Sequence, residues 1–327
     1  MRPFRYERPT DAGAAVAAVA DAPEAKYLGG GTNLVDLMRL GVETPRLLVD
    51  VTRLSAPGCE ETEAGGLLIG AATRNSDLAA ERAVRVRYPV LAQALLAGAS
   101  GQLRNAATVG GNLLQRTRCF YFQDVTKPCN KRAPGTGCPA RQGDHRNLAI
   151  VGHSEHCVAT HPSDMAVALA ALDAVIHIRG GDGDRVLPLR DLYRLPGDDP
   201  ELDTTLAHGE LITGVELPAL PWAAGSAYLK ARERASFSFA LVSVAAAVDV
   251  EDGEIADARV ALGGVAHMPW RATAAEAALR GRPPTAEVFE AAADAELREA
   301  SPLPDNAYKV PLARNLIVRA LQEVTAS

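Results

Sequence analysis

Cysteine is scarce in this sequence, with only five among 327 residues. Five cysteines are too few to build a disulfide framework for a chain of this length. Four of them fall between Cys119 and Cys157, whereas Cys59 stands alone and is interpreted as incidental. A scarce residue type that gathers in one segment predicts a local chemical role for that segment.

Long apolar runs and an excess of basic charge are also absent. No uncharged apolar stretch reaches the length of about 18 residues that a membrane-spanning helix needs. Charges and prolines interrupt residues 1–26 before the apolar core of a signal peptide develops. The formal net charge is -6, whereas nucleic-acid-binding proteins usually gather basic residues on one surface. We therefore expect no membrane span, no export signal in this chain and no nucleic-acid partner.

The composition is that of a globular protein. Hydrophobic residues make up 47% of the chain and charged residues 23%, which supplies enough apolar surface for packed cores. Because single hydrophobic cores stop growing at about 250–300 residues, we expect two or three packed units.

The N-terminal third predicts alternating helices and strands. Residues 14–50 have the pattern of a helix, a short strand, a second helix and an apolar strand, which together form a small α/β unit. Residues 67–100 continue with a strand, a turn and a helical apolar pattern. We expect this stretch to add a second layer to the same unit.

Residues 116–156 interrupt this pattern with prolines and glycines among polar and basic residues. A loop of that length inside a compact domain is usually functional or disordered, and the four cysteines favour a function. Prolines and a glycine at 218–225 predict a domain junction. Beyond it, residues 226–264 predict antiparallel strands and residues 272–324 predict a cluster of helices.

Two glycine loops are the main candidates for ligand binding. Gly29, Gly30 and Gly31 follow a short strand, where a bare backbone can approach a ligand and offer N–H donors to a pyrophosphate. The pattern is not a Rossmann fingerprint, because Leu34 occupies the third glycine position. By itself, such a loop is as often a structural turn as a ligand site. The second loop, at 107–113, has the sequence ATVGGNL.

The two loops together resemble those of the flavoprotein subunits of xanthine dehydrogenase and carbon monoxide dehydrogenase, which are molybdenum hydroxylases. The resemblance spans nearly the whole chain, from PFRYERP through YLGGGTNL, NAATVGGNL, THPSDMAVALAALDA, ELITGVELP and AYLKARE to ALGGVAHMPWRA. It implies an α+β fold with an FAD-binding domain of the vanillyl-alcohol-oxidase (PCMH) type in residues 1–220. That domain would consist of two α/β subdomains, about 1–55 and 56–220, and a C-terminal α+β domain with an antiparallel sheet and helices would follow in 221–327.

The resemblance also implies which residues bind FAD. The two glycine loops would bind the pyrophosphate, Asp164 would hold the ribose or adenine side, Ile212 would pack on the flavin, and Lys230 would approach the isoalloxazine. A cation at that position would favour the reduced, anionic flavin. Without the resemblance, Lys230 would be interpreted as a solvated surface lysine. The implied FAD-binding residues are Lys26, Tyr27, Leu28, Gly29, Gly30, Gly31, Thr32, Asn33, Leu34, Thr108, Val109, Gly110, Gly111, Asn112, Asp164, Ile212 and Lys230.

The clustered cysteines form a candidate metal site. They are Cys119, Cys129, Cys138 and Cys157. Four thiolates are the ligand number of a [4Fe-4S] cluster and of a tetrahedral zinc site. Their spacing matches no common C-x-x-C zinc pattern, so chemistry alone leaves a cluster, zinc, and free or disulfide-bonded thiols open. Histidines of the same region are alternative ligands, although hydrogen bonding to the backbone is the simpler interpretation. These are His145, His153, His156 and His161.

Among the molybdenum hydroxylase flavoproteins, a subset similar to bacterial periplasmic aldehyde oxidoreductases carries an inserted loop that resembles residues 116–160. This resemblance implies that the four cysteines ligate a [4Fe-4S] cluster. It also implies that Lys131, Arg132 and Arg141 lie beside the cluster and offset its charge.

The chain lacks signatures of a molybdenum cofactor site and of a C-x4-C-x2-C [2Fe-2S] site, so substrate oxidation is expected on a partner. The resemblance implies an oxidoreductase subunit that works with a molybdenum-cofactor large subunit and a [2Fe-2S] small subunit. This chain would pass electrons through FAD to an external acceptor. Ala235, Ser236 and Phe237 stand where NAD-linked relatives carry an acidic stretch, which argues against NAD.

Two other interpretations stay open from the sequence. A stand-alone FAD oxidoreductase would need a base or nucleophile beside the flavin, and no candidate is evident. A zinc-stapled assembly module would keep the cysteine loop without a flavin. The expected compartment is the cytoplasm, or the periplasm if a partner with a twin-arginine signal carries the folded chain.

Overall fold

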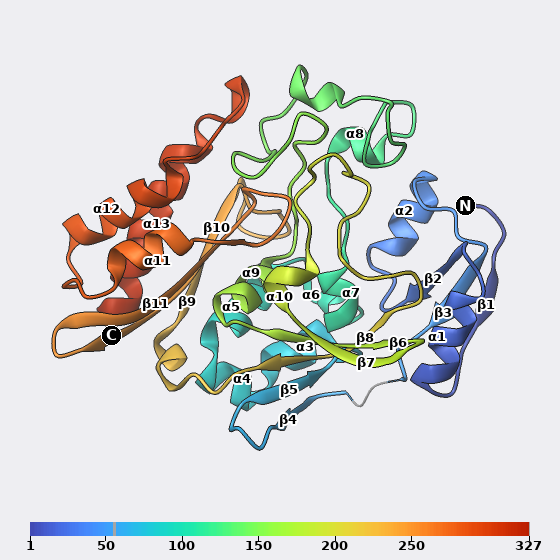
Figure 1. The fold of residues 1–327 in the computed structure, drawn as a ribbon, viewed down its shortest axis with the longest axis horizontal. Helices are drawn as coiled ribbons and strands as arrows, with labels where there is room; N and C mark the ends of the chain where they lie inside the picture. Colours follow the sequence, from blue (N-terminus) through green and yellow to red (C-terminus); the bar gives the residue numbers. More distant parts are fainter. Residues whose placement is uncertain (55–56, 327) are drawn as a thin grey trace.

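The computed structural model describes residues 1–54 and 57–326. Three β-sheets follow one another along the long axis of the molecule, from the N-terminal sheet through a central sheet to the C-terminal sheet (Figure 1). This arrangement confirms the predicted α+β fold. The predicted subdomain boundary at residues 55 and 56, and the last residue, 327, lie outside the described residues.

The N-terminal sheet is parallel and has the order β1-β3-β2. Its elements are β1 (Arg5–Glu7), α1 (Ala12–Ala20), β2 (Ala25–Leu28), α2 (Leu34–Leu40) and β3 (Leu47–Asp50). The Asp11 carboxylate accepts a hydrogen bond from the backbone N–H of Ala14 and thereby caps α1. The helix α2 ends at Gly41, whose φ of 77° favours glycine. The helix and strand pattern predicted for residues 14–50 is confirmed.

The central sheet is antiparallel and has the order β4-β5-β8-β6-β7. Its strands are β4 (Cys59–Glu61), β5 (Leu67–Gly70), β6 (Val175–Gly180), β7 (Gly183–Pro188) and β8 (Leu211–Leu217). The prediction that residues 67–100 extend the N-terminal unit is wrong, because β5 pairs with β4 and β8 in this separate sheet. The edge strand β7 is mostly exposed, and for that reason its sequence shows little apolar periodicity.

Helices pack against the central sheet and lead into the functional segments. They are α3 (Asn75–Ala80), α4 (Arg82–Arg87), α5 (Pro89–Ala97), α6 (Gly101–Arg104), α7 (Val109–Leu113), α9 (Asp164–Ala171) and α10 (Leu189–Leu192). Apart from α6, which has no buried residue, these helices join the sheet in one core that includes the buried side chains of Ile69, Tyr88, Leu91 and Met165. The starts of α7 and α9 are therefore held at fixed positions beside this core.

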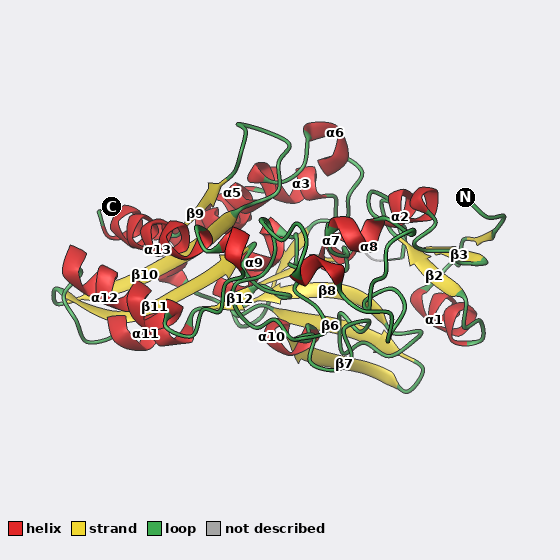
Figure 2. Ribbon diagram, turned by 90° about the horizontal axis from the view of Figure 1, so that it is seen from above, coloured by secondary structure: helices red, strands yellow, loops and turns green. Residues whose placement is uncertain are grey.

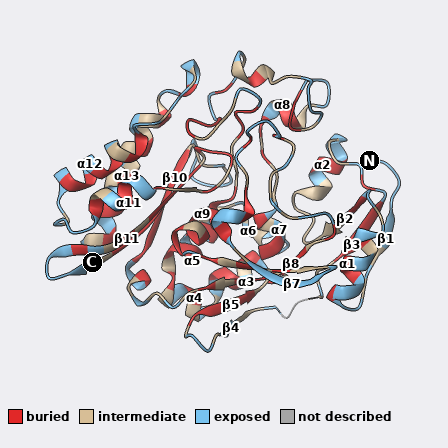
Figure 3. Ribbon diagram, viewed as in Figure 1, coloured by how far each residue is buried: buried red, intermediate tan, exposed pale blue. Residues whose placement is uncertain are grey.

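The C-terminal sheet is antiparallel and has the order β12-β11-β10-β9. Its strands are β9 (Ala227–Ala231), β10 (Val242–Glu251), β11 (Glu254–Gly263) and β12 (Trp270–Arg271). The long strand pattern in the sequence is a hairpin of β10 and β11, which turns at Asp252 and Gly253, both with positive φ. Most of β10 is buried (Figure 3), which accounts for its almost continuous apolar sequence.

Three helices complete the C-terminal part: α11 (Thr273–Leu279), α12 (Ala286–Leu297) and α13 (Lys309–Thr325). They gather at the end of the molecule opposite the N-terminus (Figure 2), while α5 and α9 of the central part also contact the sheet. The helical cluster predicted for residues 272–324 is confirmed. None of the helices in residues 1–54 and 57–326 is both long and apolar enough to cross a membrane.

Residues 114–163 contain little regular structure, namely the helix α8 (Phe120–Gln123) and a 3-10 turn at Pro139–Arg141. The segment nevertheless packs around a small core of its own, which includes Phe122, Ala140 and Leu148 together with the clustered cysteines. The prediction of a long irregular segment is confirmed. Its buried core shows that the segment is folded.

Lys309 anchors α13 from a fully buried position. Its ammonium group donates hydrogen bonds to the carbonyl oxygens of Leu148 at 2.9 Å, of Asn147 at 3.4 Å and of Gly264. These bonds tie the last helix to the cysteine-containing segment and to the turn after β11. Because burial disfavours the charged form, the pKa of Lys309 is lowered to about 7.

We expect Lys309→Met to lower the free energy of unfolding by about 1–3 kcal/mol at pH 9, because buried carbonyl oxygens lose their donor. The loss should be smaller at pH 6. The pKa of Lys309 is about 7 in the folded chain, and an unfolded lysine has a value of about 10.4. Burying Lys309 therefore costs the most free energy of folding below pH 7, and this cost decreases as the pH rises from the folded pKa towards the unfolded pKa. Chemical denaturation of both forms at the two pH values measures the difference, and an equal loss at both would contradict the assignment.

Candidate cofactor site

A cleft with two lobes runs along the glycine loops. The larger lobe has a volume of about 630 Å³ and the smaller lobe a volume of about 280 Å³. Thr32, Asn33 and Gly111 line both lobes, so the two glycine loops lie at their junction. An elongated cleft with backbone N–H groups at its middle suits a ligand that has two bulky ends and an anionic centre.

The two glycine loops approach each other through their backbones. A Cβ atom at Gly30 would lie 1.8 Å from the carbonyl oxygen of Ala106, and one at Gly29 would lie 2.7 Å from the hydroxyl oxygen of Thr108. Gly31 has a φ of 73°, which also favours glycine. The first loop therefore needs glycine for close contact as well as for its turn.

Polar atoms without partners are concentrated in the larger lobe. In the described residues, eight buried side-chain nitrogen and oxygen atoms have no hydrogen-bond partner. Five of these eight belong to residues that line the larger lobe: Asn33 Nδ2, Asn75 Oδ1, Arg118 Nε, His161 Nε2 and Ser243 Oγ. Because buried polar groups are normally hydrogen bonded, this concentration indicates that the lobe holds a ligand with several hydrogen-bonding groups.

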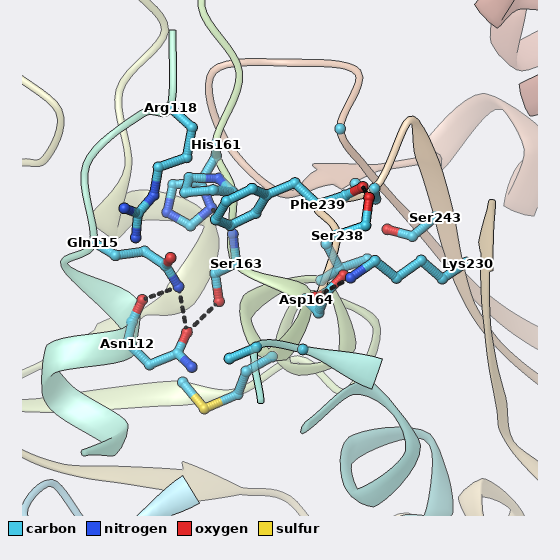
Figure 4. A pocket seen from close by; sticks show the side chains of 18 of the residues that line it. Asn112, Gln115, Arg118, His161, Ser163, Asp164, Lys230, Ser238, Phe239 and Ser243 are labelled. Atoms are coloured by element: carbon cyan, nitrogen blue, oxygen red, sulfur yellow. Dashed lines mark hydrogen bonds and ion pairs between the residues drawn. The ribbon is translucent and has the colours of Figure 1, made fainter. Parts of the chain in front are cut away.

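Lys230 of β9 lines the same lobe, but its charge is paired (Figure 4). Its ammonium group lies 2.8 Å from Asp164 Oδ2 and 3.1 Å from the carbonyl oxygen of Ala97. Tyr228 donates a 2.5 Å hydrogen bond to the other carboxylate oxygen, and burial together with this carboxylate raises the pKa of Tyr228. The positive charge of Lys230 is thus offset by Asp164.

Asn112 of the second glycine loop is held by neighbouring side chains. Its Oδ1 atom accepts a hydrogen bond from Gln115 Nε2 at 2.8 Å and one from the Ser163 hydroxyl at 2.6 Å (Figure 4). Ser163 in turn caps α9, because its hydroxyl oxygen accepts a hydrogen bond from the backbone N–H of Ala166 at 3.0 Å. The second loop and the start of α9 therefore form one hydrogen-bonded wall of the larger lobe.

The four clustered cysteines line one small internal cavity. Cys119 also lines the larger lobe of the cleft, so it stands in the wall between the two cavities. A hydrogen bond between the thiols of Cys138 and Cys157 lowers the pKa of Cys138 to about 6 and raises that of Cys157. Burial raises the pKa of Cys119 to about 11. No group of three or more histidine, cysteine, aspartate or glutamate side chains in the described chain is arranged to hold a metal ion.

The basic residues expected near the cysteines have different surroundings. Lys131 lines the cysteine cavity, and its buried ammonium group pairs with Asp203 at 2.5 Å. Arg132 and Arg141 donate hydrogen bonds to backbone carbonyl oxygens of the same segment. Lys131 is therefore placed to act on the cysteines, while the two arginines hold the loop in shape.

The four histidines considered as ligands are also separated by the fold. The rings of His145 and His153 bond to backbone groups, in agreement with the simpler interpretation. His156 lines the cysteine cavity, but its Nε2 lies 3.4 Å from the carboxylate of Asp198 at the surface. His161 lines the larger lobe, where burial lowers its pKa to about 4.

A network of ion pairs joins the segments around the two cavities. Arg116 pairs with Glu43 at 2.9 Å and with Asp203 at 2.8 Å, and its backbone N–H donates to Asn33 Oδ1 at 2.9 Å. Although burial of Asp203 favours its neutral form, Lys131 and Arg116 lower its pKa to about 2. The network therefore links the first glycine loop, the cysteine segment and the residues before β8.

Comparison with known proteins identifies the family. Residues 2–220 match the family described as FAD binding domain in molybdopterin dehydrogenase, and residues 226–324 match the CO dehydrogenase flavoprotein C-terminal domain. The chain belongs to the FAD-binding subunits of the molybdenum hydroxylase family. It is 50% identical over 327 residues to the aldehyde oxidoreductase FAD-binding subunit PaoB of Escherichia coli K12. The match covers 100% of this chain and 99% of the relative.

Other members of the family share the fold at lower identity. The carbon monoxide dehydrogenase medium chain of Hydrogenophaga pseudoflava is 26% identical over 328 residues, covering 99% of this chain and 97% of the relative. A solved structure of carbon monoxide dehydrogenase from the same organism matches with a TM-score of 0.76 at 28% identity, covering 99% of this chain and 98% of that chain. The predicted FAD-binding fold with a C-terminal α+β domain is confirmed, while the exact domain limits stay predictions.

Most of the predicted FAD-binding residues line the cleft. Those in the smaller lobe are Lys26, Tyr27, Gly29, Gly30, Gly31, Thr32, Asn33, Leu34, Thr108, Gly110, Gly111 and Ile212. Asn112, Asp164 and Lys230 line the larger lobe. Leu28 ends β2 and Val109 begins α7, and neither is among the lining residues. The bare backbone of the first glycine loop and the unpartnered atoms of the larger lobe are features that an FAD-binding subunit needs.

The cleft shows how three of the predicted FAD-binding residues lie relative to one another. Asp164 is in direct contact with Lys230, and the roles predicted for these two residues at the ribose or adenine side and at the isoalloxazine stay predictions. Ile212 lines the smaller lobe and Lys230 the larger lobe, and the predicted packing of Ile212 on the flavin stays a prediction. Motifs in the sequence do not reveal which lobe a side chain faces.

Several polar residues of the larger lobe were not predicted from the sequence. Among them are Asn75, Gln115, Arg118 and Ser243. Ser243 could have been recognised in the sequence, because it is the one polar residue in the buried, otherwise apolar stretch 242–248 of β10. Arg118 carries no such signal, since one arginine in a basic loop resembles any other.

We expect Gly30→Ala to weaken FAD binding by about tenfold or more, which corresponds to at least ~1.4 kcal/mol. The added Cβ would lie 1.8 Å from the carbonyl oxygen of Ala106 and would push the two glycine loops apart. Flavin content after purification and titration of the apoprotein with FAD measure the effect. Gly101→Ala is the matched control, because nothing lies within 4 Å of a Cβ at that position. Wild-type affinity in the Gly30 variant would show that the loop contact does not shape the site.

Proposed function

We propose that the chain is the FAD- and [4Fe-4S]-containing electron-transfer subunit of a molybdenum-containing aldehyde oxidoreductase. A large subunit with the molybdenum cofactor would oxidise the substrate, and a [2Fe-2S] small subunit would pass the electrons on. This chain would deliver them through FAD to an external acceptor. The full-length identity of 50% to an aldehyde oxidoreductase FAD-binding subunit supports the aldehyde class. Relatives named as medium chains support a complex of several subunits.

The position of Cys119 is the observation that carries this proposal. Four thiols converge on one small cavity, and Cys119 faces both that cavity and the FAD cleft. Four thiolates are the ligand set of a [4Fe-4S] cluster. No group of three or more potential ligand side chains among the described residues is arranged to hold a metal ion, so the proposal rests on the gathering of the four cysteines around one cavity. The positive charge of Lys131 beside this cavity would favour thiolates.

Bound FAD would supply the redox chemistry, because flavins exchange electrons with one-electron and two-electron partners. The residues of the chain bind and orient it. The glycine loops would hold the pyrophosphate through backbone N–H groups. The buried group of Lys230, Asp164 and Tyr228 forms a rigid polar wall of the larger lobe.

The acceptor and the compartment are parts of the same proposal. Arg234, Phe237 and Phe239 border the larger lobe, and Ala235, Ser236 and Phe237 stand where an acidic stretch would be expected for NAD. This composition supports oxygen, a quinone or a soluble carrier as acceptor. The complex would work in the cytoplasm, or in the periplasm if a partner carries a twin-arginine signal.

We expect Cys138→Ser to remove roughly four irons per chain from the complex, since a [4Fe-4S] cluster needs all four thiolates. Anaerobic iron, zinc and flavin analysis of the complex, co-expressed with its two partner subunits, measures the loss. Cys59→Ser is the matched control, because Cys59 lies on β4 in the central sheet and should leave the iron content unchanged.

Three other results would each contradict a part of the proposal. Equal iron in the wild-type and Cys138 complexes would exclude the cluster. Zinc instead of iron at the four cysteines of the wild-type complex would make this a structural metal site. A wild-type complex that contains no FAD would overturn the electron-transfer role, and turnover of aldehydes by the isolated chain would favour a stand-alone oxidoreductase.

A further inference from the structure

The cations that line the larger lobe differ in how their charge is used. Lys230 is paired with Asp164. Arg104 and Arg234 donate hydrogen bonds to backbone carbonyl oxygens. Arg118 makes no hydrogen bond or ion pair with any described residue, and its Nε atom is buried without a partner. It is therefore a cation of the FAD cleft whose donors are unused.

The side chain of Arg118 is directed into the lobe. Figure 4 shows its guanidinium group above Gln115 and Asn112, on the side of the cavity opposite Lys230. Its Cζ atom lies 5.1 Å from the centre of the Phe239 ring, which belongs to the loop before β10. Asp36 lines the same lobe and acts on Arg118 through space, but the two form no ion pair.

A guanidinium group in this position would be stabilised by an anionic ligand group. Arg118 is half-buried. Arginine remains protonated in proteins, and removing part of its charge from water without a partner is unfavourable. FAD carries two groups that can supply negative charge, namely its pyrophosphate and the isoalloxazine ring once it is reduced. A fixed cation with free donors in the wall of the cleft would stabilise either group.

We propose that Arg118 supplies the uncompensated positive charge that stabilises the anionic groups of FAD bound in the larger lobe. The proposal rests on FAD binding by this cleft and deepens the function proposed above. Arg118 lines the larger lobe, and the next residue, Cys119, lines both this lobe and the cysteine cavity. It acts as an electrostatic binding residue and exchanges neither electrons nor protons.

The test uses Arg118→Gln in the complete complex, with FAD affinity and the two-electron midpoint potential of the flavin as readouts. If the pyrophosphate is the partner, affinity for oxidised FAD falls about tenfold. If the reduced ring is the partner, affinity for oxidised FAD is kept and the potential falls by about 30 mV, which is a tenfold change for a two-electron couple. Arg118→Lys keeps the charge and should restore most of either loss.

Controls separate this proposal from a change in fold. Arg39→Gln removes an exposed arginine of α2 and should change neither readout. Arg118→Met keeps an apolar stem and replaces the glutamine variant if that variant does not assemble. Unchanged affinity and potential in a folded Arg118 variant overturn the proposal while the FAD function stands. A wild-type complex without FAD would instead overturn the function itself.

Discussion

The backbone contact between the two glycine loops is the constraint on which the cofactor cleft depends. Gly30 and Ala106 approach so closely that a single added carbon at Gly30 would lie 1.8 Å from the Ala106 carbonyl oxygen. This contact brings the parallel N-terminal sheet against the central part of the molecule. Both lobes of the cleft open from the same junction. The ion pairs of Arg116 with Glu43 and Asp203 then hold the junction closed around its rim.

The irregular segment around the cysteines extends this architecture. It has too little regular structure to be stable by backbone hydrogen bonds alone, so it relies on a small apolar core and on links to its neighbours. Lys131 links it to Asp203, and Lys309 links it to α13. Held in this way, the segment presents Arg118 and Cys119 at the wall of the FAD cleft. One stretch of chain therefore supplies both a candidate cluster ligand and a candidate flavin-binding cation.

Polar and charged side chains that are paired within the protein differ from those that have no partner. The first kind stabilises the fold, whereas the second kind is a candidate for ligand binding. Lys230 and Asp164 compensate each other, as do Lys131, Arg116 and Asp203. Such pairs are satisfied within the protein and need no ligand. The unpartnered atoms of Asn75, Arg118 and Ser243 are different, because no described side chain pairs with them and a ligand in the larger lobe would satisfy them.

The sequence by itself determined those features that depend on neighbours along the chain. The helices and strands of residues 14–50, the irregular segment and both glycine loops follow from local apolar spacing, prolines and glycines, and motif resemblance identified the family. Only the tertiary structure decided that β5 joins a separate sheet, that Asp164 pairs with Lys230, and that Arg118 is left without a partner. These outcomes depend on contacts between residues far apart in the chain. Such contacts arise from the packing of whole elements, and local sequence patterns do not encode them.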